Sequence, residues 1–242
     1  MSLSILFGLF TVLFIKNKFF KEISTDSILD ITFILIISGI LSARLYYVLV
    51  DYQYFLKHPY EIIAIWNGGI SIQGAIIGCT IAFYEYAKEK NLNFLRYADL
   101  FCFGLISGQI LGRWGNFFNS EAFGLPTNLP WKLYIPYNTR PIEYKMEEYF
   151  HPTFLYESLC NIIIFIILLS MLNKTNKFKN GTIFCAYIIL YSLVRILIES
   201  IRVDSVLNIG TRPIAQVTSA ILILISLFGI HKIYSKDKTQ SL

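Results

Sequence analysis

Residues 97–124 read YADLFCFGLISGQILGRWGNFFNSEAFG, an apolar run that ends in a dense group of polar residues. From Tyr97 to Phe118 the run is long enough to cross the roughly 30 Å hydrocarbon core of a bilayer as one helix, which needs about 20 residues. It nevertheless contains Arg113, and an arginine at the centre of a membrane helix costs about 2.5 to 3.5 kcal/mol on insertion scales. Such an arginine usually faces the protein interior or a polar cavity, so the run predicts a membrane helix that lines a site.

The rest of the chain has the same organisation. Of its 242 residues, 55% are hydrophobic and only 15% are charged, whereas a soluble domain has roughly a quarter charged residues. Strand-like alternation is absent, which favours helices over a barrel. We therefore predict an all-α polytopic membrane protein with about seven transmembrane helices in a single integral membrane domain (residues 1–242). The other six predicted spans are Leu3–Phe20, Ile28–Val50, Ile62–Tyr84, Thr153–Leu172, Thr182–Ile201 and Pro213–Ile230.

The basic residues predict the orientation of these spans. Loops on the cytoplasmic side of membrane proteins are enriched in Lys and Arg. Twelve basic residues follow the first, third, fifth and seventh predicted spans, and the alternate loops have few. The amino terminus is therefore expected outside and the carboxyl terminus inside. The net charge of +5 is then explained by topology and anionic lipid, without nucleic acid.

One hydrophilic insert, residues 124–150, falls on the outer side in this topology. It contains four prolines and five Trp or Tyr residues. Two interpretations fit equally well: a small extracytoplasmic head or lid between the fourth and fifth helices, and an ordinary aromatic belt at the membrane interface.

Polar residues converge in the outer half of the predicted bundle. Arg44, Arg113 and Arg195 each lie in the last third of an outward-running span, at one depth. Polar residues recur at helical spacing on one side of the sixth span, and on the fourth span a polar side lies next to a side made of glycines, the glycine flank. The sixth-span stripe is Tyr191, Arg195, Glu199 and Arg202. On the fourth span the polar side is Gln109, Arg113 and Asn116, and the glycine flank is Gly104, Gly108, Gly112 and Gly115. An ion-pair ladder that only holds helices together explains the sixth-span stripe equally well, and close helix packing is sufficient for the glycines.

A pocket with three arginines at head-group depth suits the phosphate of an anionic lipid, which guanidinium groups bind through paired hydrogen bonds. The sequence has no P-loop, dinucleotide fingerprint or HExxH motif. The four cysteines lie in apolar blocks, without metal-ligand spacing, and are interpreted as small core residues. No cofactor and no metal are therefore expected.

Several sequence blocks resemble those of one known family. GRWGNFFNSEAFG (112–124) resembles the signature of the bacterial prolipoprotein diacylglyceryl transferases, and HPTFLYES, ARLYYVL, WNGGISIQG and YSLVRILIESIR are similar to other blocks of that family. The resemblance implies a seven-span enzyme of the bacterial inner membrane. Such enzymes transfer the diacylglyceryl group of phosphatidylglycerol to the lipobox cysteine of a preprolipoprotein, form a thioether and release glycerol phosphate. Its partners would be phosphatidylglycerol, the signal peptide with its lipobox cysteine, and membrane lipid.

The resemblance also implies residue roles. Arg113 and Arg195 are expected to hold the leaving phosphate. The full hypothesis assigns catalysis to Arg113, Arg195, Glu121 and Tyr191, and substrate binding to Arg44, Gln73, Asn116, Asn119, Gly124, His151, Glu199 and Arg202. Glu121 and Glu199 would position the arginines, and Asn116 would donate hydrogen bonds.

Two departures from the family pattern concern the amino terminus and the base. The sequence starts at MSLSILFGLF without the Trp-Tyr-Gly element of relatives, and Gln73 stands where many members have a histidine. How the thiol loses its proton therefore stays open. Nearby arginine charge could lower its pKa without a side-chain base, or His151 or Glu121 could accept the proton. An arginine-lined lipid or anion transporter and a non-catalytic scaffold are the rival interpretations, but the sequence has no convincing inverted repeat of the transporter kind.

Overall fold

The computed structural model describes residues 2–174, 177–203, 208–209 and 212–235. These form two compact units, one made of Met1–Phe19 with Ala98–Leu242 and one of Phe20–Tyr97. The α-helices are α1 (Ser2–Phe19), α2 (Thr25–Val50), α3 (Tyr52–Lys57), α4 (Ile72–Glu89), α5 (Phe94–Phe118), α6 (Thr153–Leu172), α7 (Thr182–Glu199) and α8 (Ile214–Ser235). Short 3₁₀ helices are η1 (Pro59–Ile63), η2 (Ile65–Asn67), η3 (Tyr137–Thr139) and η4 (Ile142–Tyr144).

The all-α membrane character predicted from the sequence is confirmed. Among the described residues, six helices are long and apolar enough to cross a membrane, namely α1, α2, α5, α6, α7 and α8. The helix α4 has enough length but carries Glu85, Lys88 and Glu89 near its end.

The third predicted span differs most from the structure. We expected a helix over Ile62–Tyr84, whereas α4 begins at Ile72. The preceding residues form η1 and η2, and Gly68 and Gly69 then adopt positive φ angles of 85° and 70°. Left-handed backbone at two successive residues cannot continue a right-handed helix. Apolarity alone could not predict this break.

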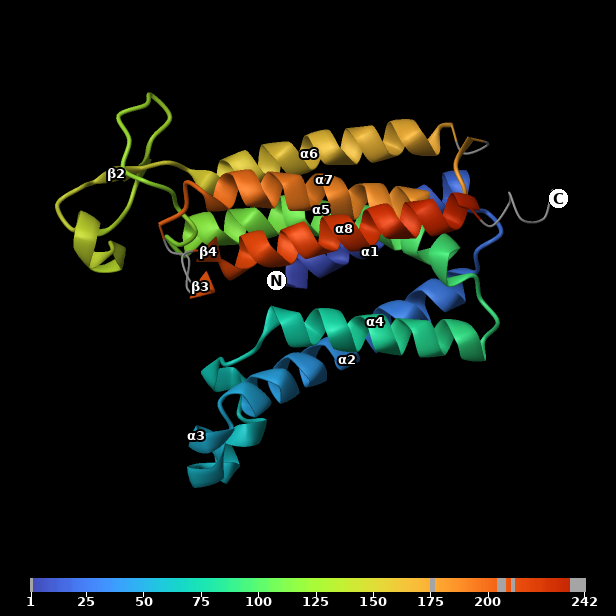
Figure 1. The fold of residues 1–242 in the computed structure, drawn as a ribbon, viewed down its shortest axis with the longest axis horizontal. Coiled ribbons are helices and arrows are strands. Elements are labelled where there is room, and N and C mark those ends of the chain that lie inside the picture. The colour runs from blue at the N-terminus through green and yellow to red at the C-terminus, as the bar shows by residue number, and fades with distance from the viewer. Residues whose placement is uncertain (1, 175–176, 204–207, 210–211, 236–242) are drawn as a thin grey trace. The chain divides into compact units, whose positions relative to one another are not determined.

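In the larger unit, α1, α5, α6, α7 and α8 lie side by side as a bundle (Figure 1). The glycine flank of α5 packs against α1: a Cβ added at Gly104 would lie 2.6 Å from Val12 Cγ2, and one at Gly8 would lie 2.8 Å from the Gly104 carbonyl oxygen. The sequence-based interpretation as packing residues agrees with the contacts of Gly104 and Gly108, whereas a Cβ at Gly115 would meet nothing within 4 Å. Close approach of the α1 and α5 backbones therefore depends on residues without side chains.

The insert between α5 and α6 has a small core of its own. Its strands β1 (Leu133–Tyr134) and β2 (Tyr149–Phe150) pair antiparallel, and Phe123, Ile135 and Phe150 are buried together. Figure 1 shows this segment projecting beyond the bundle, where α5 ends and α6 begins. A second antiparallel pair, β3 (Asn208–Ile209) with β4 (Arg212–Pro213), precedes α8.

The smaller unit is built on α2 and α4, which pack tightly along each other. Ser24 begins α2 as its N-cap, and its hydroxyl accepts a hydrogen bond from the Asp26 amide at 3.1 Å. Added Cβ atoms at Gly74 and Gly78 would collide with Ser42. The two helices can approach this closely because α4 has glycine at both contacts.

Candidate active site

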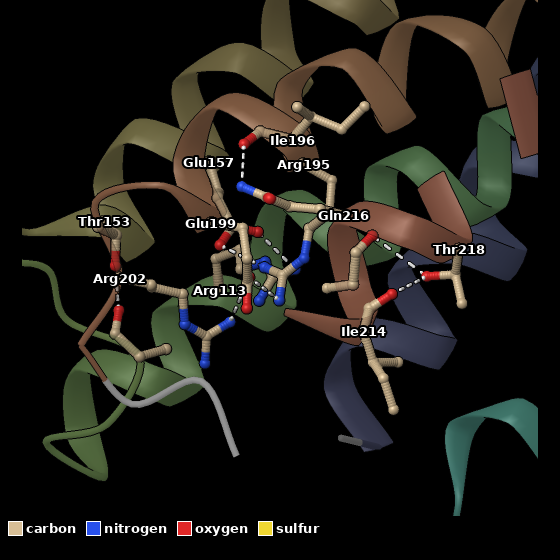
Figure 2. A network of polar contacts seen from close by, with 12 residues as sticks. Arg113, Thr153, Glu157, Arg195, Ile196, Glu199, Arg202, Ile214, Gln216 and Thr218 are labelled. Carbon is tan, nitrogen blue, oxygen red and sulfur yellow. Dashed lines mark hydrogen bonds and ion pairs between the residues drawn. The ribbon is translucent and has the colours of Figure 1, made fainter. Parts of the chain in front are cut away.

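A buried carboxylate joins the two arginines that the sequence singled out. Glu157, in the first turns of α6, is 2% exposed. One of its oxygens, Oε2, lies 2.5 Å from Arg113 Nη2 on α5, and the other, Oε1, lies 3.0 Å from Arg195 Nη1 on α7. Figure 2 shows the three side chains converging from three helices. The bundle thus brings together residues that are more than 80 positions apart in the sequence.

A second carboxylate extends this network along α7. Glu199 Oε2 lies 2.7 Å from Arg195 Nη2, one helical turn away, and 3.9 Å from Arg202 Nη1. The predicted stripe of Arg195, Glu199 and Arg202 therefore does occupy one side of the helix (Figure 2). Three guanidinium groups face two carboxylates, so the ionised network carries one excess positive charge.

Accessibility differs between the two signs of charge. The side chains of Glu157 and Glu199 are 3% and 4% exposed, whereas those of Arg113 and Arg195 are 18% and 17% exposed. Among the described residues, the contacts of Arg113 involve only Nη2, which also donates to the Tyr191 hydroxyl at 3.3 Å. Its Nε and Nη1 keep N–H groups for a ligand. The arrangement therefore suits the binding of an anion.

Glu157 is the functional candidate that the sequence analysis did not assign. Its signal was present, because it is an acidic residue one turn inside an apolar block. We had expected Glu121 and Glu199 to position the arginines. Glu199 contacts Arg195, but Glu121 is exposed and accepts a hydrogen bond from Asn119 Nδ2 at 3.2 Å. The structure thus gives Arg113 the carboxylate of Glu157.

The signature stretch continues past the end of α5 in an irregular backbone. Ser120 and Ala122 have positive φ angles of 52° and 56°, and Asn116, which is half-buried, accepts a hydrogen bond from the Glu121 amide through its carbonyl at 3.0 Å. A left-handed residue commonly ends a helix in this way. The turn redirects the chain into the insert.

Gly124 lies where three chain segments meet. Its amide donates to the His151 carbonyl at 2.9 Å, and it pairs with Arg202 as an isolated bridge. A Cβ there would lie 2.8 Å from His151 Cβ and 2.9 Å from the Ile201 carbonyl oxygen. We predicted substrate binding for Gly124, and the structure places it in a close-packed junction that only glycine fits.

His151 belongs to a short chain of polar side chains at the start of α6. Its Nδ1 lies 3.1 Å from the Tyr156 hydroxyl, which accepts a hydrogen bond from Trp131 Nε1 at 2.8 Å. The direction of the His151–Tyr156 hydrogen bond depends on which ring nitrogen of His151 carries a proton.

Arg44 and Gln73 belong to the smaller unit. Arg44 is 8% exposed and donates to backbone carbonyls of Ile62 at 2.9 Å, Gly68 at 2.7 Å and Gly69 at 2.8 Å, and to that of Glu61. Gln73 Oε1 accepts a hydrogen bond from the Ser71 hydroxyl at 2.6 Å. We had predicted head-group binding for Arg44, whose guanidinium instead organises the loop that contains η1 and η2.

Comparison with known proteins identifies the family of the chain. The sequence model of the prolipoprotein diacylglyceryl transferases matches residues 1–232. The chain belongs to this family. It is similar to the phosphatidylglycerol–prolipoprotein diacylglyceryl transferase of Acaryochloris marina, with 48% identity over 215 residues that cover 89% of this chain and 78% of that one. The enzymes of that name from Synechocystis sp. and Thermotoga maritima are 48% and 44% identical and cover 90% and 93% of this chain, and 78% and 77% of the relatives' own lengths.

Membership makes the chain a multi-pass membrane transferase of lipoprotein biosynthesis. The family resemblance inferred from residues 112–124 is thereby confirmed. The transporter and scaffold interpretations lose their support, because the matching relatives are named as transferases.

Proposed function

We propose that this protein transfers the diacylglyceryl group of phosphatidylglycerol to the lipobox cysteine of a preprolipoprotein signal peptide. The observation that carries the proposal is the pair of arginines on either side of Glu157, with buried carboxylates and partly accessible guanidinium groups. Such a pair can hold a phosphate diester and stabilise the charge that grows on it during displacement.

The chemistry follows from this placement. The lipobox thiolate attacks the glycerol carbon that bears the phosphate, a carbon–sulfur bond forms, and the carbon–oxygen bond breaks. The electron pair of that bond leaves with glycerol phosphate. Arg113 and Arg195 bind the phosphate oxygens, Tyr191 orients Arg113, and Glu157 and Glu199 hold the guanidinium groups in place. Asn116 and Asn119 follow Arg113 in the signature stretch, and Arg202 follows Arg195 along the chain. We propose that all three contact the substrate.

The thiol proton needs an acceptor, since an unperturbed cysteine is only a few per cent thiolate near neutral pH. We propose that guanidinium charge lowers the thiol pKa, so that the thiol releases its proton to water without a side-chain base, and that Gln73 hydrogen-bonds lipid oxygens. Initial transfer rates of Gln73→His, Gln73→Ala and His151→Gln from about pH 6 to 9 test this proposal. If His151→Gln abolishes transfer in a folded protein that still binds lipid, His151 is the base.

The proposed setting is the bacterial inner membrane, with seven spans in one integral domain and residues 124–150 as an extracytoplasmic head. The amino terminus would lie outside and the carboxyl terminus in the cytoplasm, as the distribution of lysine supports. Reporters fused after Asn138 and after Asn91 should be active only outside and only inside, respectively. Reversal at either site would contradict this orientation.

The decisive test of function is reconstitution of the purified protein with phosphatidylglycerol and a lipobox peptide. Mass spectrometry should detect a thioether-linked diacylglyceryl peptide together with free glycerol phosphate. A peptide with serine in place of the lipobox cysteine is the matched control and should stay unmodified. Movement of lipid between leaflets without any modified peptide would favour a transporter.

A further inference from the structure

A second polar layer lies one helical turn beneath the Arg113–Glu157 pair. The contact of Arg113 with Glu157 and the packing of Phe103 on Phe165, whose ring centroids are 5.8 Å apart, fix the antiparallel register of α5 and α6. Gln109 precedes Arg113 by one turn, and Asn161 follows Glu157 by one turn. Both therefore lie between the ion pairs and the apolar Phe103–Phe165 contact.

The side chains of this layer have unused hydrogen-bonding groups. Asn161 is 0% exposed, and among the described residues neither its Nδ2 nor its Oδ1 has a hydrogen-bond partner. Gln109 Nε2 donates to the Tyr187 hydroxyl at 2.9 Å, but the buried Gln109 Oε1 has no partner in the described part of the chain. Exchanging the oxygen and nitrogen of either amide leaves the same number of unpaired atoms.

Unpaired amides at this depth are costly because no solvent reaches them. Buried polar groups in native proteins almost always have a partner, and ordered water commonly supplies it. Asn161 Nδ2 can donate, Gln109 Oε1 can accept, and the Tyr187 hydroxyl, which accepts from Gln109, still has a proton to donate. These two donors and one acceptor can be satisfied together by one water molecule, which has two lone pairs and two protons.

We propose that Gln109 and Asn161 form a binding site for internal water beneath the arginine network. The bound water accepts a hydrogen bond from Asn161 Nδ2 and donates one to Gln109 Oε1. Water fits this layer better than the ester group of a lipid, because Asn161 and the Gln109 Oε1 atom are enclosed by the bundle. The site is independent of whether the protein transfers diacylglyceryl groups.

Water-edited solid-state NMR of the whole protein in lipid bilayers tests the proposal directly. Cys160–Asn161 is the only Cys–Asn pair in the sequence, so ¹³C′-Cys labelling together with ¹³C,¹⁵N-Asn identifies the Asn161 backbone nitrogen without a variant, and the labelled carbons of Asn161 connect it to Nδ2. In protein deuterated at carbon, water magnetisation should reach Asn161 Nδ2 well before the Asn161 backbone nitrogen. The exposed Asn119 side chain is the positive control. Equal, slow build-up at both Asn161 nitrogens would overturn the proposal.

A double-mutant cycle gives an independent measurement. Asn161→Leu should displace the water and lower the melting temperature by several degrees, on the order of 2 to 10 °C. Gln109→Met should then cost much less in the Asn161→Leu background than alone, because the water is already lost. Ser192→Ala is the matched control. Ser192 is also buried and without a partner among the described residues, but it shares the α7 face of Cys185, which is directed at Gly229 of α8.

The outcomes separate a hydrated site from a dry one. In a dry site, Asn161→Leu removes an unpaired amide and raises the melting temperature or leaves it unchanged, and its effect adds to that of Gln109→Met. Additive effects of these two changes, or coupling of Gln109 to Ser192 as strong as to Asn161, would overturn the shared water. If Asn161→Leu does not fold, the NMR measurement on the unaltered protein still decides.

Discussion

Arg44 and Arg195 each interrupt an apolar block near the carboxyl-terminal end of a helix, and the structure surrounds them differently. Arg44 donates four hydrogen bonds to backbone carbonyls and lies within 6 Å of two aromatic rings. Arg195 instead contacts the carboxylates of Glu157 and Glu199. Carbonyl contacts use the donors of Arg44 to hold one loop, whereas carboxylates keep the charge of Arg195 compensated and its position fixed. An arginine within an apolar block can therefore be assigned a ligand-binding role only after its hydrogen-bond and ion-pair partners are known.

The largest effect is expected for Glu157→Gln. A glutamine removes the charge that both Arg113 and Arg195 contact, and breaking a buried ion pair costs about 3 to 5 kcal/mol. We expect a much lower melting temperature and loss of transfer. Glu121→Gln is the matched control for stability. Because Glu121 is exposed, this variant should have the melting temperature of the unaltered protein. Equal stability of the two variants would show that Glu157 does not organise the network.

Lysine in place of Arg113 or Arg195 should be the next most severe change. Lysine keeps the charge but has no planar fork for a phosphate, and the loss of one such donor group lowers rates about 10²- to 10³-fold. We expect folded variants that transfer at this reduced rate in the reconstituted assay. Near-normal transfer by either variant would make that arginine a structural residue, as we infer for Arg44.

Arg44→Lys should mainly change stability. Lysine cannot reach all four carbonyls at once, so unpaired carbonyls should cost about 1 to 3 kcal/mol, seen as a lower melting temperature. Gly69→Ala should act in the same direction, because its φ is +70° and a Cβ would lie 2.6 Å from Arg44 Nη1. Gly115→Ala, where a Cβ would meet nothing within 4 Å, is the control for stability. If Arg44→Lys keeps its melting temperature but loses transfer activity, Arg44 binds the lipid head group as the sequence predicted.

The smallest effect concerns an exposed ion pair of the smaller unit. Burial raises the pKa of the Glu22 carboxyl, but backbone hydrogen bonding and Arg96, 2.9 Å away, outweigh it and leave the pKa below its usual value. The stabilisation is present above the unfolded-state pKa near 4.3 and is lost as the pH falls through the lower folded value. Glu22→Gln should remove roughly 0.2 to 1 kcal/mol at neutral pH and flatten acid unfolding slightly. An unchanged acid profile would show that the pair contributes nothing.

Sequence reasoning worked best where a signal is local. The bounds predicted for α6, Thr153–Leu172, agree with the structure at both ends, because Pro152 suits a helix start and a predominantly apolar run follows. The predicted start of α4 was wrong, because η1, η2 and two glycines with positive φ lie in the first ten residues of an equally apolar run. Hydropathy reports burial in lipid, and it does not distinguish a helix from turns folded around an arginine.

The sequence by itself determined the membrane class, the family and the pair of arginines that carry the proposed chemistry. Each of these depends on composition or on the order of residues within one segment. Only the tertiary structure decided which carboxylate pairs with which arginine, why Gly124 must be glycine, and that Arg44 binds backbone carbonyls. Those facts depend on contacts between segments far apart in the chain, and side-chain partners across helices are set by packing register, which no single segment encodes.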